Sequence, residues 1–396
     1  MPTTISNRPA ASVLTEVRTG PVFRDELARA TELSNATVNR QVAGLLAAGL
    51  VRERPDLAPA GTVGRPRIPV ELEPDGFGVL GLHIGLRRST LAASDLRGRV
   101  FAGIDVPNPV GDPAEVLSAL TRRLLSFGAR WPERTMLQVG VVTGGHLSAE
   151  RDTLRHPQLG WDDVPIADIV AQASGAEVAV LPQVEAMARA DMLRAVRRHR
   201  GSTLYVYARD AVDAVLTVDG NADLPTRNLG TISHLPVGGS TPCTCGSVGC
   251  LESSAGDSAV AEAALRAGVV TQPSLPQVVD AAVEGNRTAH ELLVDRARLL
   301  GRGVALVRDV LNPDRVVLLG QAFTAYRPAL AHISAAFAAR SALAPLSLQV
   351  SPLGPGVQAL AACTAALLPV YADPLGAVRR EQAGRRLSVR RTAAVS

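Results

Sequence analysis

The sequence predicts a mixed α/β protein in which an N-terminal winged helix-turn-helix precedes a duplicated α/β unit. Three apolar helical patterns and two short strand patterns occupy residues 11–72. From Val79 onward, β-rich runs alternate with helical runs, and a similar order of runs returns from Thr203. Such alternation is typical of layered sheets and helices, and its recurrence indicates a duplicated fold.

The first three helical runs are typical of a helix-turn-helix. They are expected at residues 12–20, 23–33 and 34–51, with a tight connection between Thr31 and Ser34. Ser34 is a favourable N-cap residue for the third helix, and the amides of a capped first turn can face a DNA phosphate.

The third helical run has an apolar face and a polar face. Val38, Val42 and Leu45 fall on one side by 3.6-residue periodicity, so the opposite side is free to enter a major groove. Gly44 is expected on that opposite side as well. From this helix we predict DNA contacts by Ser34, Asn35, Thr37, Asn39 and Arg40.

A strand, a loop and a second strand follow in residues 50–72 and predict the wing. Arg65 stands at the turn beside Pro66, and Arg67 comes next. An arginine on a stiff, proline-braced hairpin tip can enter a minor groove, so Arg65 and Arg67 are also predicted to contact DNA. The alternative is a small helical module that binds another protein.

Composition limits the other classes of protein. The chain has 396 residues, 46% of them hydrophobic, which is ample for buried cores. No stretch approaches the ~20 apolar residues of a membrane span, and the N-terminus lacks the apolar core of a signal peptide, so we expect a cytoplasmic protein. The formal charge is +4, and every basic residue is arginine, which suits bidentate contacts to phosphate and guanine.

Three of the four cysteines lie within eight residues and predict a metal centre. Zinc takes four nitrogen or sulfur ligands in a closed tetrahedron, and Gly246 and Gly249 let the backbone curl around it. The alternative is a redox or disulfide cluster, but Cys243 and Cys245 are too close in sequence for an easy bridge. We therefore expect one structural zinc per chain, held by His234, Cys243, Cys245 and Cys250.

Composition shifts suggest three segments. Pro74, Asp75 and Gly76 are expected to form a hinge, so the predicted winged helix-turn-helix covers residues 1–76 and the α/β domain residues 77–372. Residues 373–396 carry three arginine pairs and are expected to be a disordered basic tail. An auxiliary contact of this tail to the DNA backbone is the alternative.

Several motifs together resemble the ROK family of repressors, uncharacterised reading frames and sugar kinases. They are the GRP sequence of the wing, the run HPQLGWDDVPIADIV, and a histidine followed by CxCGxxGCxE, and the resemblance covers about residues 10–372. The resemblance implies an actin-like, hexokinase-like two-lobed domain, a structural zinc on the four residues above, a homodimer or homotetramer, and sugar or sugar-phosphate effectors.

The motifs depart from those of the kinase members of that family. Where the kinases carry the acid of their first phosphate loop, this chain has His83, and Gln183 replaces their catalytic aspartate. An amide cannot act as a general base. Gln321 replaces a glycine on the nucleotide side, and a Walker-type loop is excluded because the chain has no lysine. We therefore expect no kinase activity.

The sugar side differs too. The family's ExGH motif reads Thr231-Ile232-Ser233-His234 here, whereas a second family glutamate is kept as Glu252. His234 can bind a metal through one ring nitrogen and a sugar hydroxyl through the other. Glu252 is either a pocket residue or a solvated surface acid. The candidate ligand-binding residues are Gln183, Thr231, His234 and Glu252.

Together these features predict a nucleoid-associated transcriptional regulator, most simply a repressor, that binds a double-stranded DNA operator. Its second domain is expected to sense a sugar or sugar derivative without catalysis. The alternatives are an active sugar kinase and a regulator that responds to zinc itself. A Cys₃His set on one loop argues against the latter, because such closed sites are structural.

Overall fold

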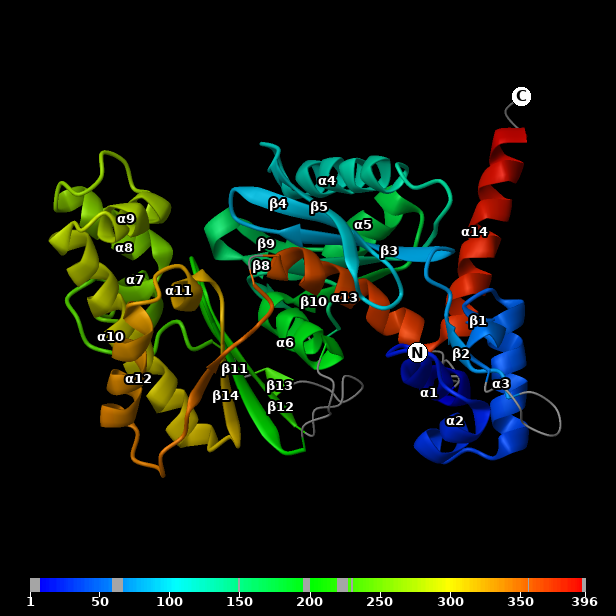
Figure 1. Cartoon of the computed structure of the whole chain (residues 1–396). Coiled ribbons are helices and arrows are strands. Elements are labelled where there is room, and N and C mark those ends of the chain that lie inside the picture. The colour runs from blue at the N-terminus through cyan, green and yellow to red at the C-terminus, as the bar shows by residue number, and fades with distance from the viewer. Residues whose placement is uncertain are drawn as a thin grey trace. The chain divides into compact units, whose positions relative to one another are not determined.

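The computed structural model describes most of the chain and divides it into two compact units (Figure 1). The described residues are 8–58, 67–148, 150–194, 200–218, 227–228, 231–354 and 356–393. The first unit consists of Met1–Ala186 and Gly356–Ser396, and the second of Met187–Pro355. Each unit is described by itself.

The first unit begins with three helices and a two-stranded antiparallel sheet, in the predicted order. The expected turn around Arg65 lies outside the described residues. The apolar faces of the three helices and the two strands meet in one core, as periodicity requires. The elements are α1 (Arg8–Val17), α2 (Arg24–Thr31), α3 (Asn35–Ala47), β1 (Val51–Glu53), the short 3₁₀ helix η1 (Pro55–Leu57) and β2 (Val70–Leu72).

A five-stranded mixed sheet in the order β10-β6-β3-β4-β5 forms the body of the first unit. Leu80 and Leu82 of β3 pack with α4 and α5, whereas Val79 belongs to the core that contains α13 and the N-terminal helices. The elements are β3 (Phe77–Ile84), β4 (Arg88–Ser94), β5 (Val100–Pro107), α4 (Pro113–Gly128), β6 (Thr135–Thr143), α5 (Ile166–Ser174), β10 (Val178–Pro182) and α13 (Val357–Ala372). A small sheet beside them comprises β7 (His146–Leu147), β8 (Leu154–His156) and β9 (Trp161–Val164), with η2 (Pro157–Leu159) between the last two.

The second unit repeats this topology, which confirms the predicted duplication. Its sheet order is β13-β12-β11-β14-β15. In both sheets three consecutive strands form an antiparallel meander, and two later strands add in parallel to the first of them. The strands are β11 (Ser202–Ala208), β12 (Val212–Val218), β13 (Arg227–Asn228), β14 (Arg315–Leu319) and β15 (Leu348–Val350).

Helices of the second unit pack mainly around the long α10, whose apolar stripe contributes to two cores. Most of residues 257–311 are helical. The helices are α7 (Leu251–Ala255), α8 (Asp257–Arg266), α9 (Leu275–Val283), α10 (Arg287–Leu311), α11 (Gln321–Thr324) and α12 (Ala329–Arg340); α6 (Gln183–Arg194) crosses the boundary between the units.

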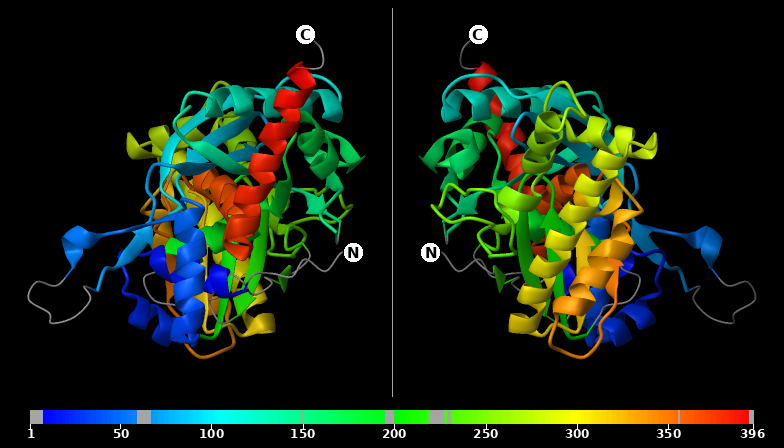
Figure 2. Two further views of the ribbon diagram at one scale, coloured as in Figure 1. Left: turned by 90° about the vertical axis from the view of Figure 1, so that its right-hand side faces the viewer. Right: turned by 90° about the vertical axis from the view of Figure 1, so that its left-hand side faces the viewer.

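The expectation of a disordered tail from Asp373 was wrong, because residues Pro374–Ala393 form helix α14. Asp373 starts this helix by accepting a hydrogen bond from the Gly376 amide at 3.1 Å. Ala377 and Val378 are buried in the same core as the N-terminal helices. The two views of Figure 2 show α14 as a long helix that starts beside the N-terminal helices of the first unit.

The segment expected to be a hinge is fixed by Arg134. This guanidinium donates to the carbonyl of Pro74 at 2.8 Å and pairs with the Asp75 carboxylate at 2.6 Å. The Gly76 carbonyl accepts from the Thr135 amide at 2.9 Å. Together with the shared core, these bonds join the N-terminal helices to the first sheet without a free linker.

No single described helix is both long and apolar enough to cross a membrane. Helix α13 and Pro374–Ala383 reach that length and hydropathy together, but they are bent by 102° at their junction. Most side chains of α13 are buried in the first unit, which explains their apolar character.

Candidate functional site

The exposed face of α3 is the first candidate site. Val38, Val42 and Leu45 are fully buried, which leaves the opposite side of the helix to solvent. Ser34 caps the helix as predicted, since its hydroxyl accepts a hydrogen bond from the Thr37 amide at 3.2 Å. The exposed residues of this face include Asn35, Ala36, Asn39, Arg40 and Ala43.

Arg40 is the cation best placed on this face. It is exposed and has no hydrogen-bond or ion-pair partner among the described residues. Thr37 is half-buried, and its hydroxyl accepts from Ser34 at 3.0 Å, so it belongs partly to the cap. Gly44 was misplaced: it lies half-buried beside Leu375 of α14, because its angular position falls at the edge of the apolar stripe.

Arg67 is engaged within the chain. Its guanidinium pairs with the Asp25 carboxylate and lies 5.0 Å from the centre of the Phe23 ring. The hydrogen bond from Arg67 lowers the pKa of Asp25 below its ordinary value. This arginine therefore ties the second arm of the wing to the start of α2, and a contact to DNA would be additional.

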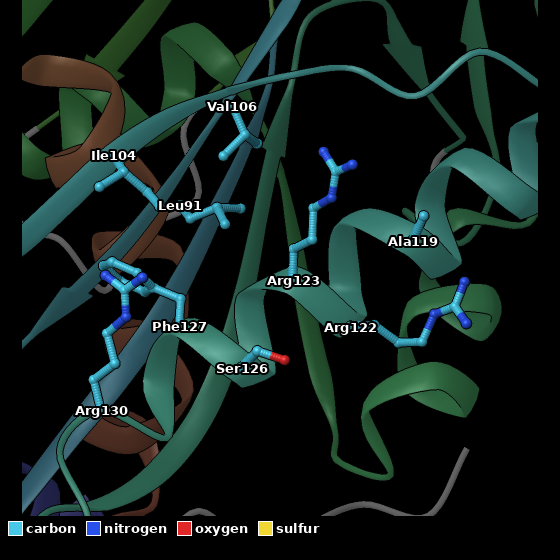
Figure 3. Close-up of a pocket in the computed structure, with 9 residues that line it drawn as sticks. All are labelled: Leu91, Ile104, Val106, Ala119, Arg122, Arg123, Ser126, Phe127 and Arg130. Carbon is cyan, nitrogen blue, oxygen red and sulfur yellow. The ribbon is translucent and has the colours of Figure 1, made fainter.

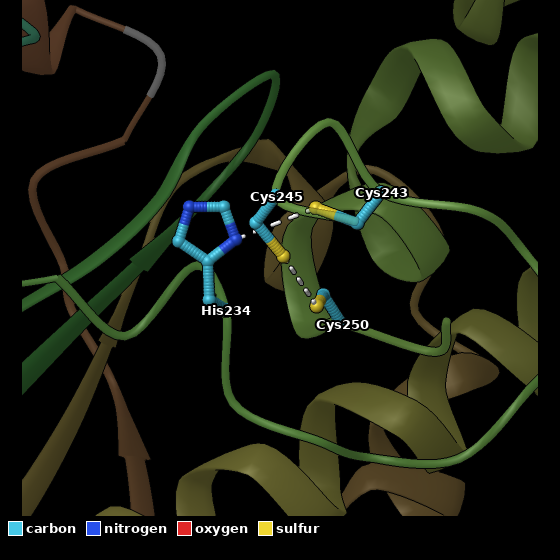
Figure 4. A group of neighbouring side chains, drawn as sticks. All are labelled: His234, Cys243, Cys245 and Cys250. Atoms are coloured by element: carbon cyan, nitrogen blue, oxygen red, sulfur yellow. Dashed lines mark hydrogen bonds between the residues drawn. The ribbon is translucent and has the colours of Figure 1, made fainter. Parts of the chain in front are cut away.

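The structure brings the predicted metal ligands together (Figure 4). One ligand atom from each of His234, Cys243, Cys245 and Cys250 lies within 4.8 Å of the others. The Cys245 and Cys250 sulfurs are 3.6 Å apart, and Cys243 Sγ lies 3.3 Å from His234 Nδ1. A tetrahedral zinc ion with ordinary bond lengths separates two sulfurs by about 3.8 Å and a sulfur from a nitrogen by about 3.6 Å.

These distances fit a metal and do not fit a disulfide. All four cysteines of the chain are free, and 3.6 Å far exceeds the length of a sulfur–sulfur bond, which is about 2.05 Å. In Figure 4 the second ring nitrogen of His234 points away from the sulfurs. The cluster can therefore hold a metal ion, and one face of the histidine is left for another partner.

The loop around the cluster is shaped by backbone hydrogen bonds. The Cys243 amide donates to the Ser247 carbonyl at 2.8 Å, and the Gly249 amide donates to the Thr241 carbonyl at 2.9 Å. Gly249 has φ +75°, and a Cβ there would lie 3.1 Å from the backbone of Gly238. Donation from the backbone and side chain of Ser247 lowers the pKa of the Cys245 thiol, which favours the thiolate that binds metal.

Gln183 and His83, which the resemblance places at the kinase base and at the phosphate-loop acid, are hydrogen-bonded to each other. Gln183 Oε1 lies 2.9 Å from His83 Nε2, and the histidine is buried. Two residues along α6, the buried Glu185 carboxylate pairs with Arg151, with N–O distances of 3.0 to 3.3 Å. This buried acid is thus held by a guanidinium of the same unit.

In the second unit, Glu252 is held by neighbours. Its Oε2 accepts from the Val212 amide and from the Ser233 hydroxyl, both at 3.0 Å. Burial raises the pKa of Asp213 to about 6, and the charge of Glu252 contributes to this rise. Thr231 is exposed, and its hydroxyl accepts from the Ser233 amide at 3.2 Å. Glu252 is therefore an anchored acid rather than a solvated one.

Sequence reasoning missed four residues of these two sites: Arg151, Glu185, Asp213 and Ser233. Asp213 left a signal, because it is the one charged residue in the otherwise apolar strand of VDAVLTV. Glu185 left a similar signal, as an acid among small apolar residues that helical periodicity places inside. The predicted ligand-binding residues fall in both units, with Gln183 in the first and Thr231, His234 and Glu252 in the second.

A groove of about 520 Å³ lies elsewhere in the first unit, between α4 and the outer strands β4 and β5 (Figure 3). Its floor is apolar, and it is bordered by Arg122 and Arg123 of α4 and by Arg130 just after this helix. None of the residues predicted to bind a ligand lines it. The lining residues are Leu91, Ile104, Val106, Ala119, Arg122, Arg123, Ser126, Phe127 and Arg130.

Comparison with known proteins agrees with this architecture. Residues 79–345 match the ROK family. Transcriptional regulator Rv0485 of Mycobacterium tuberculosis H37Rv is 42% identical over 394 residues, which cover 96% of this chain and 89% of that protein.

Two solved structures show the same fold. A ROK family transcriptional regulator, a homologue of the Escherichia coli MLC protein, has a TM-score of 0.76 at 21% identity and covers 94% of this chain and 99% of its own. The ROK hexokinase from Thermus thermophilus has a TM-score of 0.59 at 25% identity, covering 74% of this chain and 99% of its own. The mixed α/β fold thus has a hexokinase-like neighbour, and the 42% identity along nearly the whole chain, with the family match, shows that the protein belongs to the ROK family.

Proposed function

We propose that this protein is a DNA-binding transcriptional regulator, acting as a repressor, whose α/β domain senses a ligand without catalysing a reaction. The single observation that carries the proposal is the exposed face of α3, where Arg40 stands unpaired among the described residues and next to Asn39. Arginine and asparagine side chains are the usual readers of guanine and adenine in the major groove. A relative 42% identical along the chain is a transcriptional regulator, which supports the same reading.

The DNA-contacting set that we propose is Ser34, Asn35, Thr37, Asn39, Arg40, Arg65 and Arg67. The capped N-terminus of α3 faces a phosphate in this arrangement, while Asn39 and Arg40 reach base edges. Two copies in a homodimer or homotetramer would present two such helices to an inverted repeat. The protein would then act at the nucleoid in the cytoplasm.

The proposed loss of catalysis is supported by the residue at the position of the kinase base. Gln183 has no acid–base function, and its side-chain oxygen is already bonded to His83. Gln321 is exposed at the start of α11, where the kinases of the family have a glycine. Phosphoryl transfer depends on positioning several charged groups at once, so these replacements act together against it.

Ligand sensing is supported by Glu252, the family glutamate that this chain retains. Glu252 is oriented by the Val212 amide and the Ser233 hydroxyl, and a carboxylate held in this way is suited to accept hydrogen bonds from hydroxyl groups of a sugar or sugar derivative. His234 can add a hydrogen bond through the ring nitrogen that points away from the cysteines. Thr231 and Gln183 complete the ligand set that we propose.

We assign the metal as structural zinc, one ion per chain, on the four-residue cluster. The donor set of three thiolates and one imidazole, and the spacing of its atoms, fit a closed tetrahedral site. Because all four ligand positions are filled by protein, the ion's contribution is to hold the loop that leads into α7 and Glu252. A regulatory zinc would need an open or weaker site.

A genome-wide binding map of the full chain in its source organism tests the proposed function. We expect occupied sites upstream of genes, with an inverted repeat in common, and raised transcription of those genes when the regulator is deleted. Uniform, sequence-independent occupancy would contradict a specific regulator, and lowered transcription after deletion would replace repression by activation.

A further inference from the structure

Glu71, in the middle of β2, is the most heavily bonded carboxylate of the wing. Its side chain is only 4% exposed. Oε1 accepts from Arg52 Nε at 2.9 Å and Nη2 at 2.7 Å, and from Arg54 Nη1 at 2.8 Å. Oε2 accepts from Arg97 Nη2 at 3.0 Å. One buried carboxylate therefore holds three guanidinium groups.

The three arginines come from different places. Arg52 is the cross-strand partner of Glu71 on β1. Arg54 lies between β1 and η1 and also pairs with Asp56, at 2.5 to 2.8 Å, along the arm that leads into the wing. Arg97 belongs to the turn between β4 and β5, outside the wing altogether. Glu71 thus joins both arms of the wing to the first sheet.

Charge makes this junction depend on Glu71. Three cations that converge on one point repel one another, and a single anion at the centre turns the repulsion into attraction. Burial opposes ionisation of Glu71, but the hydrogen bonds from Arg54, Arg52 and Arg97 outweigh it and hold the pKa of this carboxyl below its ordinary value. If Glu71 only stabilised the wing internally, no bond to Arg97 would be required, because Arg97 lies outside the wing.

The contact continues into the ligand-sensing part of the first unit. Strand β4 ends three residues before Arg97, and it pairs with β3 along the whole run from Val79 to Ile84. The loop at the other end of this hairpin follows His83, which is bonded to Gln183. A single β-hairpin therefore runs from the proposed ligand site to the Glu71 junction.

We infer that Glu71 is a positioning residue that sets the angle of the wing on the first sheet, and that Arg97 carries the state of that sheet to the wing. The inference rests on the proposed DNA-binding function and adds its regulation. Changes at the loop after His83 would reach DNA through the β3–β4 hairpin, Arg97 and Glu71, in that order.

Two variants break the link between Glu71 and Arg97, one at each side chain, and a third serves as control. Glu71→Gln removes the charge that gathers the three arginines, and Arg97→Ala removes only the connection to the first sheet. Arg99→Ala is the matched control, because Arg99 lies in the same turn, is exposed, and has no side-chain partner in the part of the chain that the structure describes. All three are made in the full-length, zinc-loaded chain.

Hydrogen exchange without DNA gives the first readout. We expect both Glu71→Gln and Arg97→Ala to speed amide exchange in β1 and β2 by about tenfold or more, and to speed it by a smaller factor in α1, α2 and α3. Arg99→Ala should match the wild type. If Arg97→Ala leaves the strands unchanged, or if the N-terminal helices loosen by the same factor as the strands, the positioning role is overturned.

A hydroxyl-radical footprint on an operator gives the second readout, which a purely structural role would not move. We expect both variants to lose protection of the flanking minor groove, where the wing lies, and to keep protection of the major groove by α3. A footprint identical to that of the wild type overturns the inference. If the wild type itself gives no footprint, the proposed function has failed instead, and the exchange rates alone decide the role of Glu71.

Discussion

Cys245 is the most exposed cysteine of the Cys₃His cluster. Hydrogen bonds from Ser247 lower the pKa of its thiol and so favour the thiolate. Zinc binds thiolates, and the energy of binding is available only to the folded loop. We therefore expect Cys245→Ser to lower the zinc content from about one ion per chain and to lower the melting temperature. Elemental analysis and thermal unfolding measure the two effects.

The control for this variant is Cys363→Ser. Cys363 is fully buried in α13 and is not a member of the cluster, so its replacement should leave the zinc content unchanged. A wild-type protein that is folded to the same melting temperature without any metal would contradict the structural role of zinc.

A second prediction for a single residue concerns how the stabilisation by Glu71 depends on pH. At pH 7, Glu71→Gln should lower the free energy of unfolding by about 2 kcal/mol, the scale of hydrogen bonds to a charged group. The pKa of Glu71 in the folded state lies below its value in the unfolded chain, about 4.3. Its stabilisation is therefore complete above that value and is lost as the pH falls through the folded pKa.

Urea unfolding of the wild type and the variant at pH 7 and near pH 3 checks this sign. We expect the difference between the two proteins to shrink at the lower pH, because the wild-type carboxyl is then increasingly protonated. A difference that is the same at both values would show that Glu71 does not act through its charge.

At the scale of elements, α14 belongs to the folded core of the first unit. Ala377 is 1% exposed and packs in the core that contains the N-terminal helices. Ala377→Asp places an unpaired carboxylate there, and we expect it to lower the free energy of unfolding of the first unit by about 3 kcal/mol. Urea unfolding of the full chain measures this.

Arg379→Ala provides the matched control, with the same change in net charge on the exposed side of α14. It should leave the unfolding curve unchanged. Equal stability of Ala377→Asp and the wild type would mean that α14 does not stabilise the N-terminal helices, and would return the segment to a loosely attached tail.

The sequence predicts some elements well because their signals are local. The helices and the wing strands follow from periodicity, and the metal cluster follows from cysteines that all lie on one loop. Helix α14 could not be predicted in this way, because its buried apolar residues are confined to its first turns, at Leu375, Ala377 and Val378, and three arginine pairs follow them. Whether an arginine such as Arg67 is free or paired depends on Asp25, 42 residues away, and no local pattern reports that.

At the scale of the whole molecule, we expect that the protein does not phosphorylate sugars. Gln183→Asp places a carboxylate where the family resemblance implies the kinase base, but His83 and Gln321 remain where it implies a metal-binding acid and a nucleotide-side glycine. We therefore expect no activity from the wild type or from this variant in an ATP-coupled assay over a panel of sugars. Sugar phosphorylation by the wild type that Gln183→Ala abolishes would contradict the loss of catalysis.

The duplication could be predicted because the order of strand and helix runs repeats in the sequence. The core shared by the N-terminal helices, α13 and the first sheet could not, since it joins residues such as Val13 and Val370 from opposite ends of the chain. This shared core has a practical consequence. Deleting residues 1–76 would expose apolar side chains of the remaining protein, so point variants are the sounder test of DNA binding.

The reading of DNA by α3 is tested by the affinity of the full-length chain for its operator, measured for the wild type, Arg40→Ala and Arg340→Ala. Arg40 is exposed on α3 and unpaired among the described residues, so its loss should weaken specific binding by about 1–3 kcal/mol, roughly a factor of 5 to 150. Arg340→Ala should bind as the wild type does, because Arg340 is an exposed arginine of the second unit at the end of α12. Specific binding that Arg40→Ala leaves unchanged would contradict the claim that this face of α3 reads DNA.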